Sequence, residues 1–258
     1  MNAIDLFAGC GGLSEGFMQT GRFYALAHVE WERPMVETLR NRLVTKWNES
    51  EENAKKKVIL FDIQKTDELI NGNWSDDSVA LYGRANSDEV KKNGLKGVIG
   101  KKLVDLIIGG PPCQAYSIHG RATDKDSMNN DYRNYLFESF CRVVDEFRPN
   151  VVVFENVGGL LSAKPGGVPV RKRIYDAFTQ IGYQILTPEE MPSALYNAVN
   201  FNVPQYRPRV IILGVRRDSN IDLNDLYKSI EREQKLNKKL TVRDAIGHLP
   251  PLYPLEQQ

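Results

Sequence analysis

Short apolar runs alternate with longer amphipathic stretches along most of this chain, and few folds accommodate that pattern. The apolar runs have the length of β-strands and occupy residues 3–7, 24–30, 58–61, 105–108, 151–155, 183–187 and 209–215. Apolar residues at helical spacing lie over residues 13–20, 34–47, 132–147 and 170–181. Strands without an alternating polar face are typical of a parallel sheet that is covered on both faces. The sequence therefore predicts an α/β fold with a Rossmann-like, doubly wound, mostly parallel sheet.

Length and composition allow one large domain of this kind. The chain has 258 residues, of which 41% are apolar, and these suffice for a substantial core. We expect the sheet and its helices in residues 1–217, with a polar, partly helical insertion at 64–104. Residues 218–258 are expected to form a connecting segment. It begins with a charged helical stretch at 223–239 and ends in an extended exit that contains three prolines.

Charge and composition exclude several classes of protein. Lys and Arg number 34 against 33 Asp and Glu, a formal charge of +1, so a nucleic acid partner must be held by a local basic patch. The sequence shows neither a run of about 18 apolar residues nor a signal peptide, which predicts a cytoplasmic protein without a membrane partner. The three cysteines, Cys10, Cys113 and Cys141, fit neither a disulfide framework nor a zinc site, and we expect no metal.

A glycine-rich turn follows the first expected strand. Its sequence, DLFAGCGG from Asp5 to Gly12, precedes a helical pattern. Glycines there allow positive φ and let a ligand approach the N–H groups at a helix start. The spacing is neither the dinucleotide fingerprint nor a P-loop, which disfavours nicotinamide cofactors and ATP. A plain strand-to-helix turn uses the same glycines, so this motif alone leaves a ligand site open.

Acidic residues end the second and third expected strands. Glu30 and Trp31 come about twenty residues after the glycine turn, where doubly wound folds place a carboxylate that accepts from ribose hydroxyls. Asp62 and Ile63 end the third strand at the same carboxyl edge of the sheet. Each acid also fits the simpler role of a helix cap. Together, the three strand ends predict a pocket for an adenosine-type ligand.

The loop after the fourth expected strand presents a cysteine. Gly109, Gly110, Pro111 and Pro112 form a stiff loop directly before Cys113. A loop residue framed in this way is more often functional than structural. Cys113 is therefore the candidate nucleophile, with an unreactive buried cysteine as the alternative.

Charged residues stand at the ends of two later strands. Glu155 ends the apolar run 151–155, where it is a candidate proton donor or a helix cap. Arg207 and Arg209 alternate at the mouth of the last strand, so they are expected to point the same way and to hold a carboxylate, a phosphate or a base carbonyl.

In this order, the motifs DLFAGCGG, EW, DI, GGPPCQAYS, ENV and QYRPR resemble those of the DNA (cytosine-5)-methyltransferase family. The resemblance covers residues 1–250 and implies the fold of S-adenosylmethionine-dependent methyltransferases. It also implies S-adenosylmethionine as the cofactor and duplex DNA as the substrate, with a role in restriction and modification. Tyr116 and Asn202 stand where the family usually has Phe and Gly.

The resemblance assigns roles to individual residues. In the cofactor site that it implies, the glycine turn cradles the amino-acid end of S-adenosylmethionine and Glu30 holds the ribose. Trp31, Asp62 and Ile63 contact the adenine. The full set is Phe7, Gly9, Gly11, Gly12, Glu30, Trp31, Asp62, Ile63, Pro112 and Leu136. Cys113 would add to carbon 6 of a flipped-out cytosine, and Glu155 would act at ring N3. Arg209 would bind the base carbonyl, while Arg207 supports its loop.

Members of the family continue past the VRDAI stretch into a target-recognition domain and two further motifs. This sequence ends before them, and we therefore expect a catalytic half whose C-terminal part comes from the same gene or from a separate subunit. Two alternatives stay open. One is the related tRNA cytosine-5 methyltransferase, which typically has Thr where Ser117 stands here. The other is a non-catalytic nucleic-acid-binding or regulatory module with the same fold.

Overall fold

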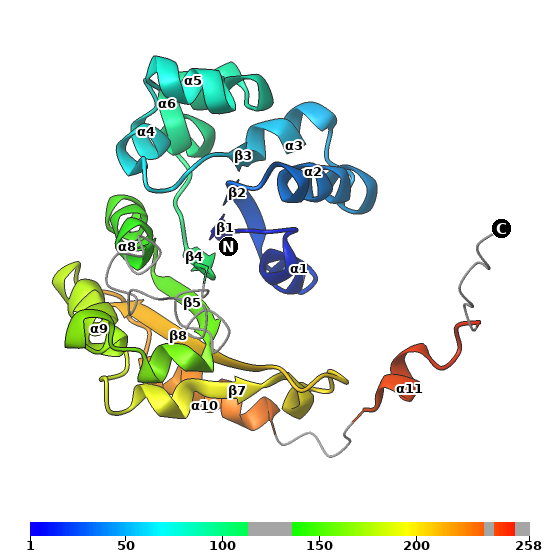
Figure 1. Ribbon diagram of the computed structural model, residues 1–258, viewed down its shortest axis with the longest axis vertical. Helices are drawn as coiled ribbons and strands as arrows, with labels where there is room; N and C mark the ends of the chain where they lie inside the picture. The colour runs from blue at the N-terminus through cyan, green and yellow to red at the C-terminus, as the bar shows by residue number, and fades with distance from the viewer. Residues whose placement is uncertain (113–135, 235–239, 251–258) are drawn as a thin grey trace.

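The computed structural model describes residues 1–112, 136–234 and 240–250 (Figure 1). Its centre is an eight-stranded sheet with the strand order β3-β2-β1-β4-β5-β8-β6, and β7 pairs with β8 outside this path. The strands are β1 (Asn2–Leu6), β2 (Tyr24–Glu30), β3 (Val58–Leu60), β4 (Leu106–Gly109), β5 (Val151–Val157), β6 (Tyr183–Gln184), β7 (Leu195–Asn197) and β8 (Pro208–Arg216).

The order of the strands confirms the doubly wound, mostly parallel sheet. The chain starts at β1, moves outward through β2 and β3, and then crosses back to β4 and β5, all five strands running parallel. β1 therefore lies at the switch point, where ligands of such sheets bind outside the carboxyl ends of the strands. β8 runs antiparallel to β5, and their register places Val157 opposite Arg209.

Helices cover both faces of the sheet (Figure 1). α1 (Gly12–Met18), α2 (Arg33–Trp47) and α3 (Glu51–Lys57) lie on one face, whereas α8 (Leu136–Phe147) and α9 (Val170–Gln180) lie on the other. Beneath α8 and α9, Phe154 packs edge to face against Phe140 and Phe178. The opposite core is aliphatic and consists of Ala8, Val36, Leu39, Leu43, Ala54, Val58 and Leu60. α10 (Leu223–Glu233) packs against β8.

The stretch between β3 and β4 forms a helical extension beside β3, at one end of the sheet (Figure 1). Its elements are α4 (Thr66–Asn71), α5 (Asp76–Tyr82), the 3-10 turn η1 (Gly83–Ala85) and α6 (Asp88–Ile99). Trp74 from this extension stacks on Phe61, with ring centroids 4.3 Å apart. The buried Asn86 accepts from the N–H of Leu60 at 3.0 Å and donates to its carbonyl at 2.9 Å. The extension therefore covers the edge of β3 that has no neighbouring strand.

Strand limits differ from the expected ones at both ends of the antiparallel region. β5 continues beyond Glu155 because β8 pairs with it as far as Val157. β6 has only two residues, whereas the sequence pattern predicted five. The cause is a turn in which the carboxylate of Glu190 accepts from the N–H and the hydroxyl of Thr187. The three-residue strand β7 was not expected.

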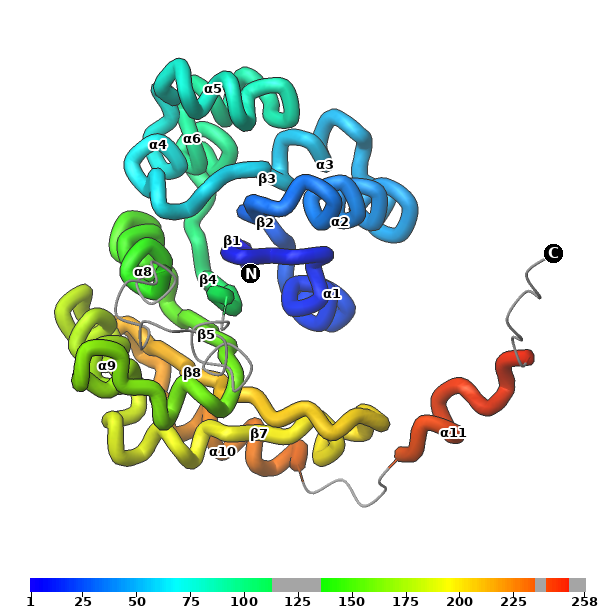
Figure 2. Tube along the Cα trace, viewed as in Figure 1, coloured from blue at the N-terminus to red at the C-terminus, as the bar shows by residue number. Residues whose placement is uncertain are grey.

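The expected extended exit is wrong over one short segment. α11 (Val242–Ile246) is a helix, and Thr241 and Asp244 form a capping box at its start. It lies apart from the rest of the molecule, with every residue of 241–250 exposed (Figure 2). In the parts of the chain that the structure describes, no helix combines the length and the apolar character that a bilayer span requires.

Candidate active site

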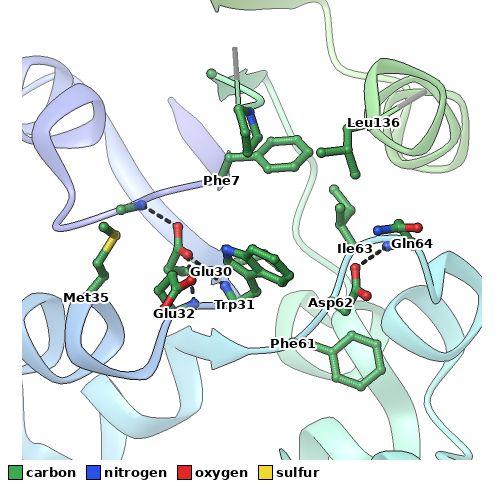
Figure 3. Close-up of a pocket in the computed structure, with 14 residues that line it drawn as sticks. Phe7, Glu30, Trp31, Glu32, Met35, Phe61, Asp62, Ile63, Gln64 and Leu136 are labelled. Atoms are coloured by element: carbon green, nitrogen blue, oxygen red, sulfur yellow. Dashed lines mark hydrogen bonds between the residues drawn. The ribbon is translucent and has the colours of Figure 1, made fainter. Parts of the chain in front are cut away.

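A pocket of about 470 Å³ opens at the carboxyl ends of β1, β2, β3 and β4 (Figure 3). This volume lies within the range of small-molecule sites. Eight of the ten expected cofactor residues line it, namely Phe7, Gly9, Glu30, Trp31, Asp62, Ile63, Pro112 and Leu136. Sequence reasoning missed six further lining residues, which are Val29, Glu32, Met35, Phe61, Gln64 and Gly110. The structure therefore brings together residues from four separate motifs.

The glycine turn between β1 and α1 has a backbone that side chains rarely adopt. Phe7, Gly9 and Gly11 all have positive φ, at 57°, 54° and 80°. A Cβ atom on Gly11 would lie 2.4 Å from Cδ1 of Leu39, so this glycine permits close packing of the turn against α2. Gly12 begins α1, and nothing lies within 4 Å of the position its Cβ would take. Gly11 shapes the turn, and neither Gly11 nor Gly12 is among the residues that line the pocket.

The carboxylate of Glu30 fastens the glycine turn to the end of β2 (Figure 3). Its Oε2 accepts from the N–H of Gly9 at 2.8 Å. Its Oε1 accepts from the N–H groups of Trp31 and Glu32, each at 2.9 Å. A carboxylate has about four acceptor sites, so one of them stays available to a ligand.

The far wall of the pocket comes from the end of β3. The Trp31 ring points into the pocket toward Asp62 and Ile63, and 49% of this residue is exposed (Figure 3). Asp62 Oδ1 accepts from the N–H of Gln64 at 2.9 Å, which fixes the turn after β3. An exposed indole face beside an apolar side chain and a carboxylate suits a flat heteroaromatic ring.

Glu155 and Arg209 form an ion pair across β5 and β8. Nε of Arg209 lies 2.9 Å from Oε1 of Glu155, and the side chains are 24% and 27% exposed. Because Val157 is the residue opposite Arg209, the two charged residues are diagonal neighbours on one face of the sheet. Nη1 of Arg209 also donates to the Pro208 carbonyl at 2.8 Å, which restrains the guanidinium further.

A second hollow of about 270 Å³ adjoins the pocket and contains the Glu155 carboxylate. Phe7 and Gly110 line both cavities, so the two are neighbours. A Cβ atom on Gly110 would lie 2.7 Å from Oε2 of Glu155, so a side chain at this position would displace the carboxylate. One ligand in the pocket and a second ligand beside Glu155 could therefore exchange a chemical group.

Asn156 holds the loop that precedes Cys113, a role that sequence reasoning missed. This residue is buried, its Nδ2 donates to the carbonyl of Pro111 at 3.1 Å, and its Oδ1 accepts from the N–H of Val157 at 2.9 Å. The signal available in the sequence was an amide inside an apolar strand, because a buried amide needs a hydrogen-bond partner.

The two remaining catalytic candidates are Cys113 and Arg207, and the structure describes only Arg207. Cys113 lies outside the described residues, directly after the end of the first described range. Arg207 is exposed, and its N–H donates to Oδ1 of Asn197 at 3.0 Å. Its backbone therefore helps to shape the hairpin before β8, while Arg209 alone reaches Glu155 within the described part of the chain.

Fold and site together define the class of the chain, which is that of Rossmann-like methyltransferases. A prophage-encoded E. coli protein assigned as a DNA modification methyltransferase has a crystal structure similar to this one. The TM-score is 0.66 at 26% sequence identity, over 98% of this chain and 56% of that one. The S. pombe Dnmt2 methyltransferase has the same fold, with a TM-score of 0.53 at 14% identity over 95% and 58% of the two chains.

The model of the C-5 cytosine-specific DNA methylase family matches residues 1–73 and 80–256, and the chain belongs to this family. It is 38% identical to the type II methyltransferase M.Bpa9945I of Bacillus paralicheniformis, over 98% of this chain and 62% of the relative. It is 33% identical to M.DdeI of Desulfomicrobium norvegicum, over 97% of this chain and 48% of the relative. The chain thus spans only about half to three fifths of the length of these relatives.

Proposed function

We propose that this chain is the cofactor-binding and catalytic part of a DNA cytosine-5 methyltransferase. It would transfer a methyl group from S-adenosylmethionine to carbon 5 of cytosine in duplex DNA, as the modification enzyme of a restriction-modification system. The observation that carries the proposal is that two cavities adjoin, one of cofactor size and one lined by Glu155, whose carboxylate is paired with Arg209. The type II methyltransferases among the relatives support the biological role.

The residues of the larger pocket fit S-adenosylmethionine. Glu30 keeps one acceptor site after binding three N–H groups, and that site suits a ribose hydroxyl. Trp31 would stack on the adenine, with Asp62 and Ile63 at its rim. When bound, this cofactor supplies an electrophilic methyl group. The glycine turn would cradle the amino-acid end, and Pro112 and Leu136 would close the pocket.

The catalytic residues would overcome the weak nucleophilicity of carbon 5. The thiolate of Cys113 forms a bond to carbon 6, while Glu155 protonates or hydrogen-bonds N3 so that the ring accepts the electron pair. Carbon 5 then gains its methyl group and loses its proton, and the electrons of that C–H bond restore the double bond and expel the thiolate. Arg209 binds the base carbonyl and holds Glu155, and Arg207 supports the hairpin behind it.

The substrate must reach these groups as an extruded base. Both faces of a cytosine are covered by stacking in a duplex, so addition of a thiolate to carbon 6 requires base flipping. The hollow beside Glu155 would receive the flipped base. Because DNA is the proposed substrate, we place the protein in the cytoplasm.

The relatives have a further region that this chain does not cover. A part that corresponds to that region would recognise the target sequence. That part would belong to the same gene product or to a separate subunit. The exposed apolar side chains of Val242, Ile246 and Leu249 on the exit segment support a further contact there.

Calorimetric titration with S-adenosylhomocysteine tests the cofactor site. We expect binding by the chain, and Trp31→Ala should weaken it by about 1 kcal/mol through loss of ring stacking. The double variant Glu30→Ala, Trp31→Ala should bind far more weakly still. Glu51→Ala, an exposed acid on α3, serves as the control and should bind like the wild type. If the wild type and the double variant bound S-adenosylhomocysteine equally well, the assignment of this pocket as the cofactor site would be wrong.

Covalent trapping tests the chemistry in the full gene product that contains this chain. DNA with 5-fluorocytosine at the target should become permanently attached to Cys113, because fluorine does not leave as a proton does. Cys113→Ser should abolish the adduct. Labelled S-adenosylmethionine offered with DNA or with tRNA separates the alternatives, since the proposal predicts label in DNA alone and a non-catalytic module would label neither.

A further inference from the structure

The amino-terminal edge of the sheet lies opposite the candidate active site and carries lysine side chains beside a tyrosine ring. Tyr24 begins β2, Lys57 ends α3 just before β3, and Lys102 lies shortly before β4. Parallel neighbouring strands bring their amino ends together, and the contacts show that these residues meet. Nζ of Lys57 lies 4.1 Å from the centroid of the Tyr24 ring, and Nζ of Lys102 lies 5.7 Å from it. Two ammonium groups therefore share one half-exposed aromatic ring.

Five exposed cations stand at or within two residues of Tyr24, Lys57 or Lys102 in the chain, and among the residues that the structure describes none of them has an ion pair. We call them the basic edge, which consists of Arg22, Lys55, Lys56, Lys101 and Lys102. The charged amino terminus lies among them, since it donates to the carbonyl of Arg22 at 2.8 Å.

Several acidic residues lie near the basic edge, and one of them, Asp88, is within electrostatic reach of Lys55. Glu49 pairs with Lys57, Asp88 pairs with Lys91, and Asp105 accepts from the N–H of Asn2 at 2.7 Å. The remaining acids of α3, Glu51 and Glu52, lie in its first turn, whereas its lysines lie in the last turn. Cations therefore outnumber the acids close to this edge, in a chain whose formal charge is only +1.

The chemistry of the basic edge suits a polyanion with regularly spaced charges. Lysine ammonium groups on flexible stems act as point charges that bind phosphates without fixed geometry. Cores of protein–protein interfaces are depleted in lysine, which disfavours a protein partner. We propose that the basic edge binds the phosphate backbone of duplex DNA without reading its sequence. Tyr24 would add an aromatic contact beside the phosphates.

The position of the basic edge separates it from the proposed active site. β2 has seven residues, so the two edges of the sheet lie about 20 Å apart. A duplex on the basic edge is therefore a different segment from one that presents a base to Glu155. Such binding would raise the local concentration of DNA around the enzyme. This proposal does not depend on methyl transfer.

Fluorescence anisotropy with a labelled duplex of arbitrary sequence, titrated at several salt concentrations, tests the proposal. The test variant reverses four charges of the basic edge, Lys55→Glu, Lys56→Glu, Lys101→Glu and Lys102→Glu. Each phosphate contact contributes about 0.9 to the slope of log K against log salt, so the slope should fall in magnitude by about three to four. At low salt the Kd should rise about tenfold or more.

A matched control reverses four charges elsewhere, Lys92→Glu, Lys172→Glu, Lys228→Glu and Arg232→Glu, on α6, α9 and α10. Its overall charge equals that of the test variant, and its slope should stay close to that of the wild type. Equal loss of affinity in both variants would overturn the proposal, as would tighter binding of polyglutamate than of the duplex. Melting temperature and titration with S-adenosylhomocysteine show whether each variant is folded. A chain that binds the duplex but not S-adenosylhomocysteine would contradict the proposed function and leave the basic edge intact.

Discussion

Arg209 forms an ion pair with Glu155, a residue that lines the second hollow, with Nε and Oε1 2.9 Å apart. Neighbouring strands supply the two residues, so the sheet itself sets their separation. The guanidinium also donates to its own chain at Pro208, and a planar group with several donors can make both bonds at once. A lysine offers one point charge on a flexible stem and cannot reproduce this geometry.

Arg209→Lys is therefore expected to lower kcat/KM for the proposed methyl transfer, measured on the enzyme together with its target-recognition part. A hydrogen bond from the charged guanidinium to the base carbonyl would contribute about 1.5–3 kcal/mol, and its loss corresponds to roughly ten- to 150-fold. Affinity for S-adenosylhomocysteine should change little, because Arg209 does not line the larger pocket. Arg217→Lys, an exposed residue just after β8, is the control. A wild-type kcat/KM for Arg209→Lys would show that the ion pair has no part in the reaction.

Much of the site at the residue scale could be predicted from the sequence. Glu30, Trp31, Asp62 and Ile63 stand directly at strand ends, and the carboxyl edge of a parallel sheet brings such residues together. Asn156 could not be placed in the same way. Its partner is the Pro111 carbonyl, 45 residues earlier in the chain, and a spacing of that length carries no periodic signal.

At the scale of elements, the helical extension between β3 and β4 supports one wall of the pocket. Asn86 provides the N–H and C=O partners that a further strand would give to Leu60, and Trp74 stacks on Phe61. Phe61 and the two residues after it line the pocket. The polar composition of this stretch indicated an insertion, but its connection to the pocket depends on tertiary contacts that no local pattern shows.

We expect Asn86→Ala to destabilise the fold and to weaken cofactor binding. The change leaves the N–H and C=O of Leu60 in a buried environment without their partner, at a cost of about 1–3 kcal/mol. Urea unfolding and titration with S-adenosylhomocysteine measure the two effects. Asn71→Ala, an exposed residue of the same extension, should change the unfolding free energy by less than about 0.5 kcal/mol. Equal results for both variants would contradict a supporting role of Asn86.

α1 and α2 are joined by a charged cluster with a defined pH dependence. The Lys46 ammonium, with further hydrogen bonds from Trp47 and Gln19, lowers the pKa of Glu15 to about 2, against an ordinary value of 4.5. Because the folded pKa is depressed, the stabilisation is fully present above pH 4.5 and is lost as the pH falls toward 2. Glu15→Gln removes this titration. The difference in unfolding free energy between wild type and Glu15→Gln should narrow steadily from pH 6 to pH 2, and a constant difference would contradict the assignment.

The parallel core could be predicted better than the antiparallel elements for a physical reason. Strands buried on both faces give continuous apolar runs, as in β1 to β5, whereas the three residues of β7 are too few for a periodic signal. α11 had a readable signal, since Thr241 and Asp244 have the spacing of a capping box. The prolines that suggested an extended exit come after this helix in the chain.

For the whole molecule, the direction of the parallel strands places the candidate active site and the basic edge at opposite edges of the sheet. Carboxyl ends of the strands gather the pocket and the Glu155–Arg209 pair, while amino ends gather the basic edge. The near-zero formal charge of the chain conceals this asymmetry, because the composition reports only a total. Where the cations lie could be known only once the strand order had placed the starts of β3, β2 and β4 along one edge of the sheet, with β1 between β2 and β4.

This separation predicts that two ligands bind without coupling. A duplex of arbitrary sequence bound at the basic edge would lie about 20 Å from the pocket, and no residue of the basic edge lines that pocket. Coupling between sites requires that one ligand change the affinity for the other, and the change is reciprocal. The Kd for S-adenosylhomocysteine, measured by calorimetry with and without saturating duplex, should therefore agree within about twofold, and duplexes of different sequence should bind equally weakly. A tenfold change in either direction would mean that the duplex occupies the active-site edge instead.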